Sequence, residues 1–306
     1  METPEFNPTP YKISTITATG SINTSVNLDA FFKNIPIIDM SETDVCNGIV
    51  YAEFGSRKND TVFKGTPKKN NGNKKTPESR KRFDNQVTII YKFLDGVNAS
   101  VNAKIFRNGN VQMTGLRYIE QGHIVIDYII SILTNIHKTD ETIVTDMEGM
   151  SNTNYRIRLI NCDFRIGFEI KRDKLYKLTL NDYKVSSSFE PCIYPGVKIQ
   201  YWWNDLNTIK NGCCYCNKSC GGKGCGSGEG ECKKITIAVF QSGCIIITGG
   251  QSLEQIDEAY AFICNCIKTN LQTILKVPAP LPDVEVKKKK VYIKKSRIRK
   301  APEVPI

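Results

Sequence analysis

Six cysteines lie within a glycine-rich stretch of the chain, between residues 211 and 232. Thiolates spaced this closely are typical zinc ligands, and four of them can hold one tetrahedral ion. Cys213 and Cys216 form a Cys-x-x-Cys pair with a suitable bite, and the site could be completed by Cys220, Cys225 or Cys232. We therefore expect a structural zinc ion here and no other cofactor. The alternative is a flexible loop with unliganded thiols, because the spacing is not a regular pair of knuckles.

No other group of residues is typical of a reaction centre. The sequence offers no nucleophile beside a base and no pair of carboxylates that would serve acid–base catalysis. We therefore expect a binding protein and not an enzyme. An accessory domain of a nucleic-acid enzyme is an alternative, but too few residues remain outside the duplicated region for a catalytic domain.

The elements that would position a binding site are duplicated. Residues 103–115, AKIFRNGNVQMTG, reappear as residues 237–249, IAVFQSGCIIITG. Each copy predicts a strand that ends in Phe, a tight turn with Gly, and a second strand that ends in Thr-Gly. An internal repeat of this kind indicates two similar halves packed pseudo-symmetrically, which suits a nearly two-fold ligand such as duplex DNA.

The net charge of +11 is concentrated in two segments. Residues 57–82 carry ten Lys or Arg and two acids, and residues 287–300 carry nine Lys or Arg and no acid. The rest of the chain is slightly acidic. Such runs either solubilise the protein or attract the phosphates of DNA without reading sequence.

The twelve cysteines and the N-terminal sequence bear on the compartment. Met1-Glu2-Thr3-Pro4 does not open a secretory signal, and no apolar run approaches the length of a membrane span. We expect a reducing compartment, no membrane partner and no secretion.

Hydrophobic periodicity predicts the same order of elements in both halves. Strands are expected over 12–28, 48–54, 61–64, 87–93, 155–170 and 197–203, and helices over 29–35, 118–137, 173–178 and 252–275. Ser252 with Gln255 has the spacing of a capping box. We predict an α+β fold in which two repeats form a curved antiparallel sheet of about ten strands, with helices on one face. The predicted parts are a disordered N-terminus (1–10), a first repeat (11–138) with a basic insertion (57–82), a second repeat (154–276) with a Cys-rich insertion (211–232), and a basic tail (277–306).

At this level of detail the sequence resembles the TATA-box-binding protein family. The resemblance covers roughly residues 11–138 and 154–276. It rests on the Phe106 and Phe240 strands, the Thr-Gly strand ends at Thr114 and Thr248, the segment Lys81-Arg82-Phe83, and the loop Ser187–Gly196. The chain is more similar to the divergent versions of large DNA viruses than to a cellular protein. The resemblance implies a saddle-shaped fold whose helices cover the convex face.

The resemblance also implies how the chain would bind DNA. In this family the sheet presses into the minor groove and aromatic side chains wedge into base steps, an example that general accounts of DNA kinking already use. The wedges would be Phe106 with Phe83, and Phe240 with Tyr194, although each aromatic could instead be ordinary core. The remaining groove contacts would come from Thr15, Lys104, Gln112, Thr114, Ala238, Ile246 and Thr248.

Four positions depart from the family pattern. Thr15 and the region of Ile157 replace the asparagines that contact the central base pairs, and Lys104 and Gln112 replace apolar residues of the groove floor. These changes predict either an altered A·T-rich element or weak specificity that depends on partners.

One loop keeps the family pattern better than the DNA-reading positions do. In the family it binds a transcription factor IIB-like protein, and here its contact residues would be Phe189, Glu190, Pro191 and Tyr194. Glu190 would supply an acidic contact. Pro191 and Pro195 would hold the loop rigid, which lowers the entropy cost of docking. The prolines could instead only shape the turn before the strand at Val197.

The resemblance therefore implies a transcription initiation factor that binds and kinks promoter DNA through the minor groove. It would recruit a IIB-like factor and RNA polymerase, in the nucleus or in a cytoplasmic viral factory of an infected cell. The alternative is an architectural DNA-packaging protein without sequence preference.

Overall fold

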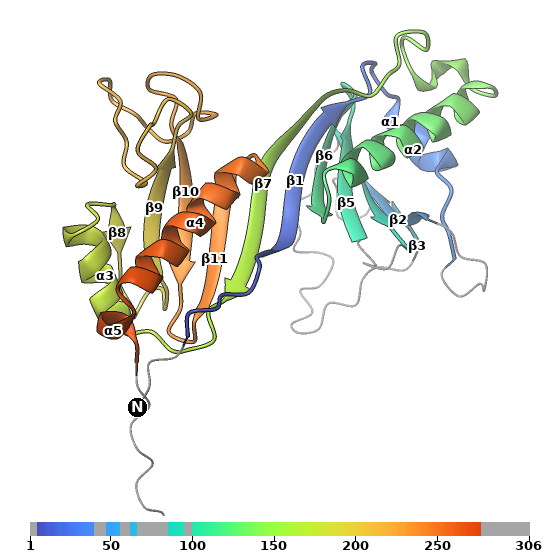
Figure 1. Ribbon diagram of the computed structural model, residues 1–306. Coiled ribbons are helices and arrows are strands. Elements are labelled where there is room, and N and C mark those ends of the chain that lie inside the picture. Colours follow the sequence, from blue (N-terminus) through green and yellow to red (C-terminus); the bar gives the residue numbers. More distant parts are fainter. Residues whose placement is uncertain (1–4, 40–46, 56–61, 66–84, 95–99, 277–306) are drawn as a thin grey trace, which may run out of the picture. The chain divides into compact units, whose positions relative to one another are not determined.

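A computed structural model describes residues 5–39, 47–55, 62–65, 85–94 and 100–276. Within these residues, eleven strands form one antiparallel sheet in the order β3-β2-β4-β5-β6-β1-β7-β11-β10-β9-β8 (Figure 1). The predicted α+β class with a large antiparallel sheet is confirmed. Most of the basic insertion, and the whole basic tail, lie outside the described residues.

The first half of the described chain supplies six of the strands. They are β1 (Lys12–Ser21), β2 (Gly48–Phe54), β3 (Val62–Gly65), β4 (Gln86–Lys92), β5 (Ser100–Phe106) and β6 (Asn110–Leu116). Its helices are α1 (Leu28–Asn34) and α2 (Glu120–His137), followed by the short η2 (Glu141–Ile143). The part of the basic insertion that the structure describes is the edge strand β3, which pairs with β2.

The second half repeats this order. Its strands are β7 (Thr153–Arg165), β8 (Ser187–Ser188), β9 (Val197–Trp203), β10 (Lys233–Val239) and β11 (Cys244–Gly250). Its helices are α3 (Arg172–Asn181), α4 (Leu253–Thr269) and α5 (Leu271–Ile274). The first strands of the two halves, β1 and β7, pair with each other, so the repeats share one sheet.

Alternating side chains explain why these segments form a sheet with one covered face. In β9, Val197, Ile199 and Tyr201 are buried while Lys198 and Gln200 between them are partly exposed. The buried residues face the helices: α2 packs on β1 and β6, and α4 packs on β10 and β11 (Figure 1). The helices therefore cover one face of the sheet and leave the other face uncovered.

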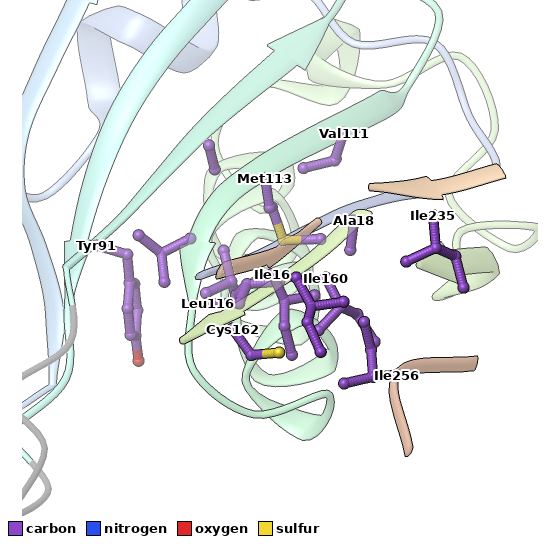
Figure 2. Close-up of a cluster of buried hydrophobic side chains, with 14 of the residues drawn as sticks. Ile16, Ala18, Tyr91, Val111, Met113, Leu116, Ile160, Cys162, Ile235 and Ile256 are labelled. Carbon is purple, nitrogen blue, oxygen red and sulfur yellow. The ribbon is translucent and has the colours of Figure 1, made fainter. Parts of the chain in front are cut away.

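The core is a single apolar cluster that spans both repeats. Figure 2 shows part of it, where side chains of β1, β6 and β7 meet those of β10 and α4. Ile16, Met113, Ile160, Ile235 and Ile256 are all completely buried. Because burial of a side chain of this size contributes about 1.5–3 kcal/mol, the cluster holds the two halves together.

Gly20 marks a close approach of β1 to α2. A Cβ atom at Gly20 would lie 2.5 Å from Cδ1 of Ile126 in α2. The capping box predicted at the start of α4 is present, because the Ser252 hydroxyl accepts a 3.3 Å bond from the backbone N–H of Gln255. The Gln255 side chain in turn accepts from the backbone N–H of Gln251.

Three features differ from the sequence-based expectations. Residues 5–10 were expected to be disordered, but Thr9 exchanges two hydrogen bonds with the backbone of Arg165, and Phe6 packs against Phe168. The first strand ends at Ser21 and not at Leu28, because Asn23 takes a positive φ of 64°. The helix expected over 252–275 is interrupted at Asn270, whose side-chain amide donates a hydrogen bond to the carbonyl of Cys266.

Among the described helices, none combines the length and the apolar character that crossing a membrane requires.

The tight turns of the repeated hairpins predict a measurable stability difference. Gly243 has a φ of 76°, and a Cβ atom there would lie 2.2 Å from the carbonyl oxygen of Phe168. Gly167 has a similar φ of 83° with nothing within 4 Å of such an atom. Gly167→Ala should lower the free energy of unfolding by about 1–2 kcal/mol, and Gly243→Ala by clearly more. Urea denaturation measures both, and an equal loss would contradict the proposed close contact.

Candidate nucleic-acid interface

The side chains that alternate with the core form the face of the sheet opposite the helices, which we call the open face. Gly20 points at α2, so its neighbour Thr19 points the other way. The same alternation holds in β5 and β6, where every second residue is buried. The open face includes Thr15, Thr17, Thr19, Thr88, Asn102, Lys104, Gln112, Thr114, Arg156, Arg158, Asn161, Gln200, Thr236, Ala238, Ile246 and Thr248.

The structure brings the seven predicted groove residues onto this face. Lys104 lies directly opposite Gln112 across β5 and β6, and Ala238 lies opposite Ile246 across β10 and β11. Thr114 pairs with Thr17, and Thr248 lies beside Asn161. Thr15 is partly engaged already, because its hydroxyl accepts a 3.2 Å bond from the backbone N–H of Gly115.

The second predicted pair of aromatics meets at the end of the β10–β11 hairpin. The ring centroids of Tyr194 and Phe240 are 5.7 Å apart, with 57° between the ring planes. Gly196 allows this approach, since a Cβ atom there would lie 2.9 Å from the Tyr194 ring. The ammonium of Lys198 sits 4.3 Å from the centroid of the Tyr194 ring. The two rings form a half-buried aromatic pair beside a cation.

The first predicted pair can be placed only in part. Phe106 is half-buried at the end of β5, and Phe83 lies outside the described residues. Phe106 borders a cleft of about 630 Å³. We call it the arginine cleft, because three of its twelve lining residues are Arg107, Arg156 and Arg158 and none is acidic. Four asparagines and Gln112 also line it, so the cleft offers many hydrogen-bond donors.

The predicted partner loop, residues 189–195, projects from the second repeat. Glu190 and Pro191 are exposed, and Ile193 at the tip is 78% exposed. The Glu190 carbonyl accepts 2.9 Å bonds from the backbone N–H groups of Ile193 and Tyr194, which makes one tight turn. Phe189 is half-buried and points back to α3, where the Arg172 guanidinium lies 5.1 Å from its ring centroid.

Arg172 ties this loop to the neighbouring hairpin. Its guanidinium donates to the carbonyl of Pro195 and to the Gln241 side chain. Gln241 in turn donates to Glu169, which is paired with Lys276 at 2.8 Å. The loop therefore has a fixed base, while its tip remains free to contact a partner.

Four cysteines of the Cys-rich insertion converge where it connects β9 to β10. The sulfur atoms of Cys214, Cys216, Cys220 and Cys232 all lie within 4.8 Å of one another. Cys232 Sγ is 3.6 Å from Cys214 Sγ and 3.4 Å from Cys216 Sγ. Sulfurs bound at 2.3 Å to one tetrahedral zinc would be about 3.8 Å apart, so this donor set fits a zinc ion. The distances are far too long for disulfides.

The polar groups around the cluster also suit thiolates. The backbone N–H of Gly230 donates to Cys216 Sγ at 3.2 Å, and the Asn204 amide donates to Cys232 Sγ at 3.5 Å. Burial and the neighbouring thiols raise the pKa of Cys232 above its usual range. A bound cation would reverse this effect, because metal binding removes the thiol proton.

The predicted ligand set is wrong at two positions. Cys213 turns away from the cluster, with its sulfur 3.6 Å from the carbonyl of Lys184, and the adjacent Cys214 takes its place. Cys225 is exposed, and its carbonyl accepts a 2.9 Å bond from the Gln255 side chain of α4. Spacing alone favoured Cys213 because Cys-x-x-Cys is the commoner motif, and only the backbone path shows that Cys214 is oriented inward.

Sequence reasoning missed Arg156, Arg158, Asn161 and Arg172. The first three belong to β7, where bulges shift the pairing with β1 and change which residues share a face. Arg158 Nε donates a 2.9 Å bond to the Thr19 hydroxyl across this pairing. The run Arg156-Ile-Arg158 was a visible signal, since two cations two residues apart in a strand lie on one face.

Comparison with known proteins identifies the family. No protein-family profile matches the chain. Over 275 residues, which are 87% of this chain and 67% of the relative, it is 30% identical to the TATA-box-binding protein-like protein of Acanthamoeba polyphaga mimivirus. The chain belongs to the TATA-box-binding protein-like family. The resemblance to a divergent viral member is therefore confirmed.

A solved structure with some similarity is the TBP of Methanococcus jannaschii. The two chains are 18% identical, the match covers 85% of this chain and 99% of that one, and the TM-score is 0.46.

Proposed function

We propose that this TATA-box-binding protein-like chain is a transcription initiation factor that binds promoter DNA through the open face and kinks it. The support is the aromatic pair Tyr194–Phe240 at the edge of a sheet face that the helices leave uncovered. Aromatic side chains in this position can enter an unstacked base step, and A·T-rich steps are the easiest to unstack. Phe106 would act in the same way in the first repeat, with Phe83 as its companion.

Family membership favours this proposal over an architectural packaging protein. The relative is named as similar to a protein that binds the TATA box, which is a sequence-defined element, and packaging needs no such element. We also propose that the chain acts by binding and not by catalysis, and that it works where DNA is transcribed in a reducing compartment, such as a nucleus or a viral factory.

We further propose that the partner loop recruits a IIB-like factor and, through it, RNA polymerase. The exposed Glu190, Pro191 and Ile193 offer an acidic and apolar tip on a base fixed by Arg172. A loop held in this way loses little entropy on docking.

Zinc is the proposed metal of the cysteine cluster. Four thiolates select zinc over harder cations, and with no open position such a site is structural. Cys214, Cys216, Cys220 and Cys232 would hold the ion. The ion would link Cys214 and Cys216 to Cys232 beside β10, closing the insertion on itself.

The kinking mechanism predicts a loss of bending without a loss of electrostatic attraction. With dyes at both ends of an A·T-rich duplex, the wild-type protein should raise energy transfer. Phe106→Ala combined with Phe240→Ala should leave transfer near the value of free DNA, while salt-sensitive association persists. Tyr118→Ala, which truncates an exposed aromatic at the start of α2, is the control and should bend DNA normally. An unbent duplex with the wild-type protein would refute the mechanism.

The partner loop predicts a selective effect of charge reversal. Glu190→Arg should leave binding to bare DNA unchanged and weaken the ternary complex with the cognate IIB-like factor by about tenfold or more. Glu148→Arg reverses an exposed charge elsewhere and should have no effect. Gel-shift titration measures both complexes, and a ternary complex that tolerates Glu190→Arg would show that the partner docks elsewhere.

The metal site predicts close to one zinc per chain in elemental analysis of protein purified without chelator. Cys216→Ser or Cys232→Ser should abolish zinc binding, and Cys213→Ser or Cys225→Ser should retain it. Because protons compete for the thiolates, and the pKa of Cys232 is raised, zinc should be lost as the pH falls and retained as it rises. A protein that loses zinc on Cys225→Ser but not on Cys232→Ser would contradict this ligand set.

A further inference from the structure

The two repeats present chemically different surfaces at matching positions of the open face. In the first repeat, the cross-strand pair two residues before the aromatic is Lys104–Gln112. In the second repeat, the same pair is Ala238–Ile246. Gln112 is exposed and Lys104 partly exposed, whereas Ala238 is only 6% exposed. At this position the first repeat therefore presents a polar, cationic pair, and the second repeat presents an apolar pair.

The surroundings extend this difference. Beside the polar pair lies the arginine cleft, where Arg156 and Arg158 stand next to Gln112 and Phe106 without any acidic neighbour in the lining. At the corresponding hairpin of the second repeat, Gln241 replaces Arg107, and its side chain is already bonded to Arg172 and Glu169. The second repeat also has a cation here, because Lys198 lies opposite Ala238, but its ammonium sits 4.3 Å from the centroid of the Tyr194 ring.

The minor groove offers these two surfaces different chemistry. Every base pair presents acceptors there, but only G·C adds the 2-amino group of guanine as a donor. Against Ala238 and Ile246 that donor would be buried without a partner, which is costly. The Gln112 side chain can accept from it, while Lys104 and the arginines donate to the acceptors and phosphates that every sequence provides.

We propose that the open face reads its two half-sites by different rules, so that DNA lies on it in one direction. The second-repeat half, over Ala238 and Ile246, requires A·T pairs. The first-repeat half, over Lys104, Gln112 and the arginine cleft, accepts G·C pairs. The specificity-determining residues are these two cross-strand pairs. This inference rests on the proposed function, since it assumes that the open face binds the minor groove.

The test compares three duplexes of equal length: all A·T, G·C in one half-site, and G·C in both half-sites. The wild-type protein should bind the one-sided duplex within about threefold of the all-A·T duplex, because it can place the G·C half over Gln112. It should bind the two-sided duplex about tenfold to a hundredfold more weakly, since one guanine donor must then face the apolar half.

Exchanging the pairs between repeats supplies matched variants. Lys104→Ala with Gln112→Ile gives both halves the apolar pair. This variant should bind the one-sided duplex as weakly, relative to the all-A·T duplex, as the wild-type protein binds the two-sided duplex. Ala238→Lys with Ile246→Gln gives both halves the polar pair and should restore binding of the two-sided duplex. Because Ala238 is buried, Ile246→Gln alone serves as a second, milder variant, with a smaller gain in the same direction.

The outcomes separate this inference from the proposed function. A wild-type protein that binds no A·T duplex would overturn both. A wild-type protein that binds A·T but treats one-sided and two-sided duplexes alike would overturn only the half-site rule. Arg156→Gln with Arg158→Gln should weaken all three duplexes and flatten the salt dependence, and an unchanged salt slope would remove the arginine cleft from the interface.

Discussion

The antiparallel pairing of β1 with β7 is the constraint on which the rest of the structure depends. It joins the first strands of the two repeats along most of their length, from Lys12 opposite Asp163 to Ser21 opposite Thr153. Without it each repeat would expose the edge of its sheet, and the open face would be divided in two. With it, Ile16 and Ile160 pack in one core, and Thr17 and Arg158 share one continuous surface. The register shifts in this pairing also place Arg156 and Arg158 on that surface.

The helices, the partner loop and the cysteine cluster are all positioned by this sheet. The helices close one face, so the partly exposed side chains of the strands gather on the other. Arg172 fixes the partner loop to the hairpin beside it, and the cysteine cluster closes the long connection between β9 and β10. The cluster lies at one end of β9 and β10 and the Tyr194–Phe240 pair at the other, so the proposed metal site and the proposed DNA-contacting rings occupy opposite ends of the same two strands.

Much of the fold was predictable from local signals. The strands at Gly48–Phe54 and Val197–Trp203 follow from clear alternation, and the start of α4 follows from its capping box. What the sequence could not show was set by contacts between distant residues. The ordered conformation around Thr9 depends on its hydrogen bonds with Arg165. The helix breaks at Asn270, whose side chain donates to Tyr183 and to the carbonyl of Cys266. The inward orientation of Cys214 depends on the path of the whole insertion. Of the candidate site, the residues on regular strands were predictable, whereas Arg156 and Arg158 were missed because bulges in β7 decide their face.

The central claim is that the open face contacts DNA from the minor groove. Methylation interference tests it most directly, because methylation at adenine N3 blocks the minor-groove edge and methylation at guanine N7 blocks the major-groove edge. Adenine N3 methylation within the bound site should abolish complex formation, and guanine N7 methylation should leave it intact. Loss of binding on guanine N7 methylation, with tolerance of methylated adenine N3, would contradict it.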